Sequence, residues 1–147
     1  MRITRRSLLK LLATLANWPF VTFAAQTTAA AAFGEHNATD ALRDLNASRA
    51  AASTDIVLRI PANAEDRLVV PLEITSDLPD TRAIDILVEQ NPWPLAATFR
   101  FSNGALPFIA THLRIGQDSD VIAVAHCTDG TYTTHKAVHL TSGGCAS

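Results

Sequence analysis

Short apolar runs with a period of two fill residues 54–141 of this 147-residue chain, and they constrain its fold more than any other feature. Polar and apolar side chains alternate along most of the runs, and turn-forming Gly, Pro, Asn and Asp residues separate them. Because successive side chains of a strand point to opposite faces, such alternation indicates strands that are buried on one side. Short strands divided by turns are typical of an antiparallel β-sandwich. We predict seven strands, at residues 55–60, 67–75, 82–90, 97–101, 108–115, 120–127 and 131–140.

Two local signals refine this prediction. Asp129-Gly130 lies between the last two runs, and this dipeptide favours a tight type I′ hairpin. The last two strands should therefore be adjacent and antiparallel. Pro71 lies inside the second run, where it cannot donate a ladder hydrogen bond, which predicts an edge strand or a bulge.

Residues 33–53 precede the strands and have a different pattern. Ala41, Leu42 and Leu45 recur at helical spacing, and Thr39 is the candidate N-cap. An Ala- and Ser-rich segment, residues 47–54, follows them and indicates a linker. We therefore expect one short N-terminal helix joined to the sandwich by this linker.

Residues 1–32 have the pattern of a twin-arginine export signal. Arg5-Arg6 is followed by a mainly apolar run of about fifteen residues and then by Ala-rich sequence. That run is shorter than the ~20 residues that cross a bilayer, although an uncleaved anchor stays an alternative. Small residues make cleavage after Ala24 or after Ala32 the two candidate positions. The signal predicts export in a folded state to the periplasm.

Charge limits the partners of the mature protein. The leader carries four basic residues and no acidic one, so its removal leaves eight basic against fourteen acidic residues, a formal charge of −6. Nucleic acids and anionic membrane surfaces need basic patches. We therefore expect no nucleic-acid partner and, once the signal is cleaved, no stable membrane association. The mature length of about 115 residues is that of one domain.

The chain ends in Gly143-Gly144-Cys145, with Ala146 and Ser147 after the thiol. Glycine has no Cβ and is costly to order, so residues 142–147 should form a flexible arm. Fully extended, this arm takes the sulfur some ~15 Å beyond the last strand. Such a thiol suits a covalent carrier that presents its cargo to other enzymes. The alternative is a frayed tail with an incidental or disulfide-bonded cysteine.

A second cysteine, Cys127, ends the sixth run on the same face as Val121, Ala123 and Ala125. That pattern favours a small core or edge residue, although His126 beside it could tune the thiol. In an oxidising compartment the two cysteines could also pair.

Two other features have residue types that occur in binding sites. His135 and His139 would share one face of a strand about 13 Å apart, so we expect no metal site there. Asn91-Pro92-Trp93-Pro94 forms a stiff turn. Its tryptophan is either a hydrophobic plug over one end of the sandwich or a contact for a partner protein, because Trp is common in interface hot spots.

Three segments together resemble one protein family. They are Ala83-Ile-Asp-Ile-Leu-Val-Glu-Gln-Asn-Pro-Trp-Pro-Leu-Ala-Ala-Thr-Phe99, Ser119-Asp-Val-Ile-Ala-Val124 and the terminal Gly-Gly-Cys. Their combination is similar to the SoxY family, the sulfur carriers of periplasmic thiosulfate oxidation. The family tail usually reads Gly-Gly-Cys-Gly-Gly, so Ala146 and Ser147 depart from it and stiffen the tip slightly.

The resemblance implies an immunoglobulin-like sandwich that forms a heterodimer with a second small β-protein, SoxZ. It implies a carrier without catalysis or a cofactor of its own, which holds thiosulfate-derived sulfur on Cys145. A haem-containing c-type cytochrome would load the thiol, and a hydrolase would release sulfate. A sulfur dehydrogenase would act on the remaining sulfane where it is present.

Two rival functions remain at this point. One is an immunoglobulin-like adaptor whose Cys145 is paired with Cys127 or with another chain. The other is a small periplasmic thiol oxidoreductase, which needs a vicinal dithiol or a nearby base, and the sequence contains neither.

Overall fold

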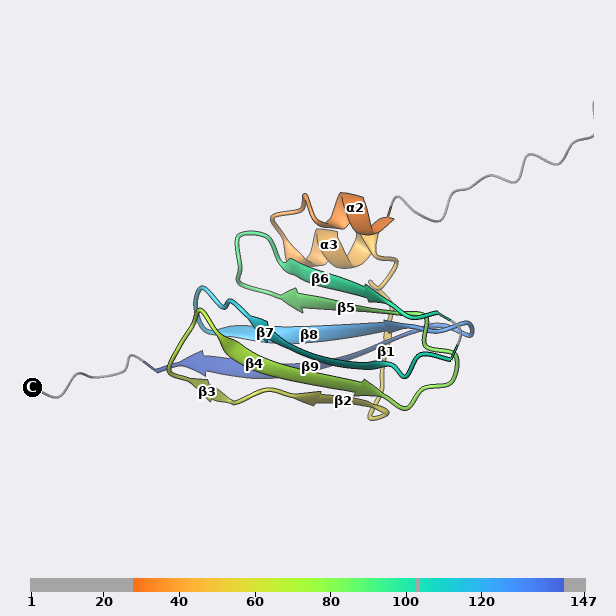
Figure 1. Ribbon diagram of the computed structural model, residues 1–147. Helices are drawn as coiled ribbons and strands as arrows, with labels where there is room; N and C mark the ends of the chain where they lie inside the picture. The colour runs from red at the N-terminus through yellow and green to blue at the C-terminus, as the bar shows by residue number, and fades with distance from the viewer. Residues whose placement is uncertain (1–27, 103, 142–147) are drawn as a thin grey trace, which may run out of the picture.

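Two β-sheets packed face to face form the body of the protein (Figure 1). The computed structural model describes residues 28–102 and 104–141. The larger sheet has the order β1 (Ala51–Ala52), β9 (Thr131–Leu140), β8 (Ser119–His126), β5 (Ala83–Val88) and β6 (Leu95–Arg100), and β3 (Asn63–Ala64) also pairs with β9. The smaller sheet has the order β2 (Ile56–Arg59), β4 (Val70–Ser76) and β7 (Phe108–Leu113).

The predicted all-β, immunoglobulin-like sandwich is confirmed, and each of the seven predicted runs overlaps one of the longer strands, with ends that differ by up to three residues. The short strands β1 and β3 were not predicted. Both run parallel to β9, with Ala51 opposite Tyr132 and Asn63 opposite His139. Strands of two residues are too short to show a period in the sequence. Because β1 lies within residues 47–54, the prediction that this whole segment is a linker without strands was wrong.

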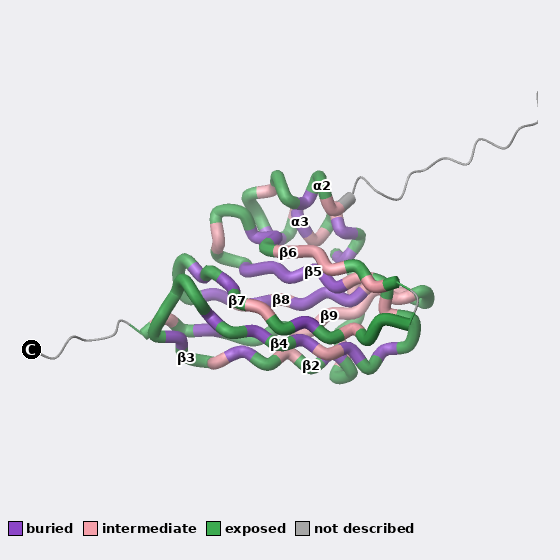
Figure 2. The backbone as a smooth tube through the Cα atoms, in the orientation of Figure 1, coloured by how far each residue is buried: buried purple, intermediate pink, exposed green. Residues whose placement is uncertain are grey.

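The main core lies between the two sheets. Strand β5 lies between β8 and β6 in the larger sheet and is buried on both faces (Figure 2). Its residues Ile84, Ile86 and Val88 face the smaller sheet, whereas Asp85 and Leu87 face the other way. The largest fully buried side chains of the main core are Val70, Leu72, Ile74, Ile84, Ile86, Val88, Ile115, Val121 and Val138.

Two short helices, α2 (Thr28–Ala32) and α3 (Ala38–Asp44), cover the outer face of the larger sheet beside β5 and β6 (Figure 1). They bury a second cluster, consisting of Ala32, Ala41, Leu45, Ala47, Leu87, Leu95 and Val124. These helices fix which residues of the larger sheet are removed from water on its outer face.

Helix α3 begins two residues earlier than expected. Its N-cap is Asn37, whose side-chain oxygen accepts the backbone N–H of Thr39 at 2.8 Å, so the assignment of Thr39 as the cap was wrong. The helix ends in a Schellman motif. Asn46 has φ 57°, the Ala47 N–H donates to the Leu42 carbonyl, and the Asn46 N–H donates to that of Arg43.

The β8–β9 hairpin is confirmed, but its turn is not type I′. His126 pairs with Thr131, and the Cys127 N–H donates to the Gly130 carbonyl at 2.8 Å. Thr128 and Asp129 therefore occupy the centre of the loop, one position before the Asp-Gly dipeptide. A type I′ turn needs positive φ at both central residues, and among the described residues only Asn46, Asp80 and Gly104 have it.

Pro71 is neither in an edge strand nor at a bulge, because β4 is the central strand of the smaller sheet. It lies opposite His112 of β7. On its other side β2 pairs only with residues 73–76, so it ends before Pro71. Strand β4 can therefore contain a proline at this position, because β2 does not extend far enough to pair with it.

No helix among residues 28–102 and 104–141 is long and apolar enough to cross a membrane.

Candidate functional site

Strand β9 anchors the C-terminal segment at one end of the sandwich. The Leu140 N–H donates to Asp118 Oδ1 at 2.8 Å, and the Thr141 N–H donates to the Ala64 carbonyl at 2.9 Å. Gly143, Gly144 and Cys145 lie outside the described residues. The predicted carrier thiol, that of Cys145, therefore belongs to the fourth residue after Thr141. Thr141 directly follows β9, and its N–H is held by β3.

Asp118 joins this anchor to a histidine. Its Oδ2 lies 3.0 Å from Nδ1 of His139, so one carboxylate holds two consecutive residues of β9. The Leu140 N–H is the main cause that lowers the pKa of Asp118, and the hydrogen bond to His139 adds to it. His135 shares the outward face of β9 with His139, as predicted. Within residues 28–102 and 104–141 no three His, Cys, Asp or Glu side chains are grouped as metal ligands.

The turn with the exposed tryptophan lies at this same end of the molecule. It joins β5 to β6, and the Gln90 N–H donates to the side chain of Ser119, the first residue of β8. Strand β5 lies two strands from β9, which corresponds to about 10 Å. The turn and the root of the arm are therefore on one end face of the sandwich (Figure 1).

Trp93 is 58% exposed, so it does not form the hydrophobic plug that was one of the two interpretations. Pro92 is also exposed, whereas Pro94 is fully buried and presents no surface. His36, which precedes α3, supports the turn: its Nδ1 lies 2.9 Å from the Pro92 carbonyl, and its ring lies 5.3 Å from that of Trp93.

A cavity of about 370 Å³ adjoins the tryptophan and is lined by Asn91, Pro92, Trp93, Arg114 and Gly116. Asn91 closes its floor, because its amide donates to the Arg114 carbonyl and its oxygen accepts the Gly116 N–H, both at 2.9 Å. A Cβ at Gly116 would lie 3.3 Å from that oxygen, so glycine permits the close approach. These two hydrogen bonds tie the turn to residues 114–116.

Between this turn and β9 the same end is acidic. A shallow cavity of about 320 Å³ is lined in part by Glu89, Asp118 and Asp120. The end of β9 therefore lies beside these carboxylates, of which Asp118 is paired with His139.

Cys127 lies at the opposite end of the sandwich. It is paired with Gly130, and Thr141 is eleven residues further along β9, which corresponds to about 35 Å. From Thr141 the Cα of Cys145 can extend at most ~14 Å, and a disulfide joins Cα atoms no more than ~7 Å apart. The folded chain cannot close a bond between its two cysteines.

The surroundings of Cys127 are those of a structural residue. It is half-buried, packs against the main core as predicted, and has its sulfur 3.6 Å from Oγ1 of Thr81. His126 does not contact this thiol. Its side chain points to the other face of β8 and its Nε2 lies 2.7 Å from Oδ2 of Asp85.

The sequence of the whole domain matches one family. The model of the sulfur oxidation protein SoxY matches residues 42–145, which include both cysteines and the Asn91–Pro94 turn. The chain belongs to the SoxY family.

The solved structures agree with this assignment in fold. The sulfur carrier protein SoxY from Chlorobium limicola f thiosulfatophilum superposes with a TM-score of 0.65 at 23% identity, covering 74% of this chain and 96% of that one. A superoxide reductase (neelaredoxin) from Ignicoccus hospitalis has a TM-score of 0.53 at 14% identity, covering 58% and 80%. A search of curated sequences found no significant match. The superoxide reductase shares the sandwich fold, so the fold by itself does not indicate the function.

One polar pair of this SoxY domain escaped the sequence reasoning. Asp85 lies in the helix-covered face of β5, its side chain is 3% exposed, and its partner His126 is 26% exposed. Asp85 Oδ1 and the facing Thr98 Oγ1 are buried and have no hydrogen-bond partner within the part of the chain that the structure describes. The sequence did contain a signal for this pair. Asp85 is the only charged residue in the run Ala-Ile-Asp-Ile-Leu-Val, whose apolar residues occupy both faces of the strand, so its carboxylate had to be buried and to need a partner.

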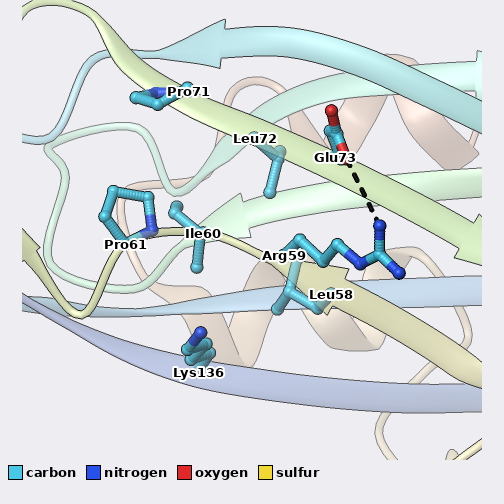
Figure 3. A pocket seen from close by; sticks show the side chains of 8 residues that line it. All are labelled: Leu58, Arg59, Ile60, Pro61, Pro71, Leu72, Glu73 and Lys136. Atoms are coloured by element: carbon cyan, nitrogen blue, oxygen red, sulfur yellow. Dashed lines mark ion pairs between the residues drawn. The ribbon is translucent and has the colours of Figure 1, made fainter.

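A last cavity, of about 360 Å³, opens where the sheets part between β9 and the smaller sheet (Figure 3). Arg59 and Glu73 form an ion pair at 3.8 Å on its rim, and both side chains are more than half exposed, so the pair contributes little. Lys136 lines the cavity from the middle of β9. This cavity lies away from the arm root and is not part of the candidate site.

Proposed function

We propose that this SoxY family member is a periplasmic carrier of sulfur substrates in thiosulfate oxidation. Intermediates are held covalently on the thiol of Cys145 and presented to partner enzymes. The observation that carries the proposal is the Gly-Gly-Cys segment, which lies inside the family match and begins two residues after the last anchored residue, Thr141.

The chemistry of loading is an oxidation. The Cys145 thiolate and thiosulfate form a new S–S bond, giving a cysteine S-thiosulfonate, and the thiol proton and two electrons leave. A haem-containing c-type cytochrome accepts the electrons. Hydrolysis of the terminal sulfonate by a partner hydrolase then adds one water, releases sulfate and leaves a persulfide on the cysteine. A sulfur dehydrogenase oxidises that sulfane further where the host has one.

The carrier's own residues supply position rather than activation. An ordinary thiol has a pKa near ~8.5 and is a few per cent thiolate at neutral pH, so the partner's pocket activates it. The carboxylates of Glu89, Asp118 and Asp120 surround the root of the arm. They repel a sulfonate-bearing cargo from the carrier's own surface at short range.

Trp93 and Pro92 provide a contact for a partner protein beside the arm. Exposed tryptophans are frequent anchors of interfaces, and the cavity at this turn is rigid. The partner is a SoxZ-like β-protein in a stable heterodimer, or an enzyme that takes the thiol. Export by the twin-arginine route places the complex in the periplasm.

The two cysteines provide the test. Cys145→Ser and, as the matched control, Cys127→Ser are incubated with thiosulfate and the conjugating cytochrome, and intact masses are measured. We expect wild type and Cys127→Ser to gain the mass of one thiosulfate, and Cys145→Ser to gain none. Loading of Cys145→Ser but not of Cys127→Ser would refute the site. A free-thiol count of the exported protein separates the carrier from the rival adaptor, whose cysteine is tied to another chain.

A further inference from the structure

Helix α2 lies within the segment that the sequence assigns to the export signal, yet it packs as part of the domain. Ala32 is fully buried in the second cluster, together with Ala41 and Leu45 of the α3 region and Leu87 of β5, and Ala29 packs against the same cluster. Figures 1 and 2 show α2 lying across α3 above the larger sheet.

The backbone around the Ala32–Phe33 bond is hydrogen-bonded as well as buried. The Phe33 N–H donates to the Ala29 carbonyl at 3.2 Å, and the Ala32 carbonyl accepts the Glu35 N–H at 3.3 Å. Peptidases cut exposed, weakly held backbone, so the susceptibility of a bond follows from its burial and its hydrogen bonds. Cutting after Ala32 would require α2 to unwind and leave the cluster.

The sequence offers two positions for signal cleavage, after Ala24 and after Ala32. An exported protein that folds before it crosses the membrane meets the signal peptidase in its folded state. We propose that the precursor is cleaved after Ala24, so that α2 is retained as a structural part of the mature carrier. This inference rests on the export that is part of the proposed function. The mature charge of −6 is unchanged, because residues 25–32 carry no charged side chain.

Retention of α2 also has a packing reason. Leu87, Leu95 and Val124 form the outer face of the larger sheet, and the two helices are what covers them. A chain beginning at Phe33 keeps α3 but loses Ala29 and Ala32 from this cluster. It exposes apolar surface that costs free energy in proportion to its area.

The test is the N-terminus of the protein purified from the periplasm of a host with twin-arginine export, measured by intact mass. We expect Ala25 as the first residue. A first residue of Phe33, or an uncleaved chain, would overturn the proposal.

Two matched variants sharpen the result. Signal peptidases require small residues at the first and third positions before the cut. Thr22→Lys blocks the third position before Ala24, whereas Ala30→Lys blocks the equivalent position before Ala32 and keeps the packing, because Ala30 is exposed. We expect Thr22→Lys to accumulate as precursor and Ala30→Lys to be processed like the wild type. The reverse pattern would refute the assignment.

A comparison of two purified chains tests the structural role separately. The chain beginning at Phe33 should melt at a lower temperature than the chain beginning at Ala25, and equal melting temperatures would contradict a structural role for α2. Loading of Cys145 with thiosulfate is measured on the same samples. Because loading and processing are scored independently, failure of the carrier function is distinguishable from failure of the cleavage assignment.

Discussion

Two histidine–aspartate pairs of similar length, one buried and one exposed, allow a direct test of how burial changes the value of a polar contact. His126 and Asp85 are joined at 2.7 Å beneath the helices, and the Asp85 side chain is 3% exposed. His139 and Asp118 are joined at 3.0 Å on the surface, and both side chains are more than half exposed. The perturbation is the replacement of each histidine by alanine.

The expected cost of His126→Ala follows from what remains behind. Asp85 Oδ1 already has no hydrogen-bond partner, so the variant leaves both oxygens of a buried carboxylate unpaired. Breaking a buried pair costs about 3–5 kcal/mol, and a hydrogen bond to a charged group contributes about 1.5–3 kcal/mol. Because His126 is a quarter exposed, water reaches this end of the pair. We therefore expect a loss of about 2–3 kcal/mol in the free energy of unfolding.

The assay is urea unfolding of the mature chain followed by circular dichroism. With m-values of about 1–3 kcal/mol/M for small proteins, His126→Ala should lower the midpoint by roughly 1–2 M without changing m. His139→Ala should leave the midpoint nearly unchanged, since exposed ion pairs are solvated and gain little. Equal shifts for the two variants, or a shift of His126→Ala within experimental scatter, would refute the reasoning.

A double variant separates desolvation from packing. Asp85→Val with His126→Val removes the buried carboxylate along with its partner and introduces β-branched side chains, which strands favour. Replacing both members of a buried pair by apolar groups is often nearly neutral. The double variant should therefore recover more than half of the loss seen for His126→Ala. A double variant as unstable as His126→Ala would show that the lost ring packing, not the unpaired carboxylate, is the cause.

Three further outcomes are expected. Gly143→Val with Gly144→Val should leave the melting temperature unchanged but lower the rate of sulfate release by the partner enzymes, to a different extent for each. The reason is that β-branched residues are excluded from most of the φ/ψ space that glycine visits. Unchanged rates would show that the arm need not bend. Trp93→Ala should weaken partner binding about tenfold or more at an unchanged urea midpoint, whereas Leu106→Ala, an 83% exposed residue at the opposite end, should not; equal effects in a binding titration would contradict the assignment of the interface. The lowered pKa of Asp118 means that its contribution to stability is present above pH 3.8 and lost as the pH falls through the folded-state pKa, so Asp118→Asn and wild type should differ in urea midpoint at pH 6 and converge well below pH 3.8.

Local patterns were sufficient for most of the fold. Alternation predicted the seven longer strands, because a strand's side-chain period depends on nothing but its own backbone. Helical spacing also predicted the short helix around Ala41 and Leu42 that precedes the sandwich. The Gly-Gly-Cys tail and the Asn91–Pro94 turn were likewise recognised from the chain itself.

Apart from the N-cap, which was assigned to Thr39 instead of Asn37, the errors concern pairings between distant residues. The position of the β8–β9 turn depended on register, since a shift of one residue places a different dipeptide at its centre. Pro71 was predicted to lie in an edge strand or at a bulge, and this was wrong. A proline has no N–H to donate, and none is needed on the side of β4 where β2 ends before it reaches Pro71. Strands β1 and β3 exist because β9 offers them an unpaired edge.

What the sequence by itself determined is the alternation of the strands and the family of the chain, because both are read from short segments of neighbouring residues. Tertiary structure alone decided that Asp85 meets His126 beneath the helices, that the Trp93 turn shares an end face with the root of the arm, and that Cys127 lies beyond the reach of Cys145. It also decided that Ala32 is buried. These relations depend on strand order and on which face a helix covers, and such long-range contacts are set by the packing of the whole domain rather than by any segment within it.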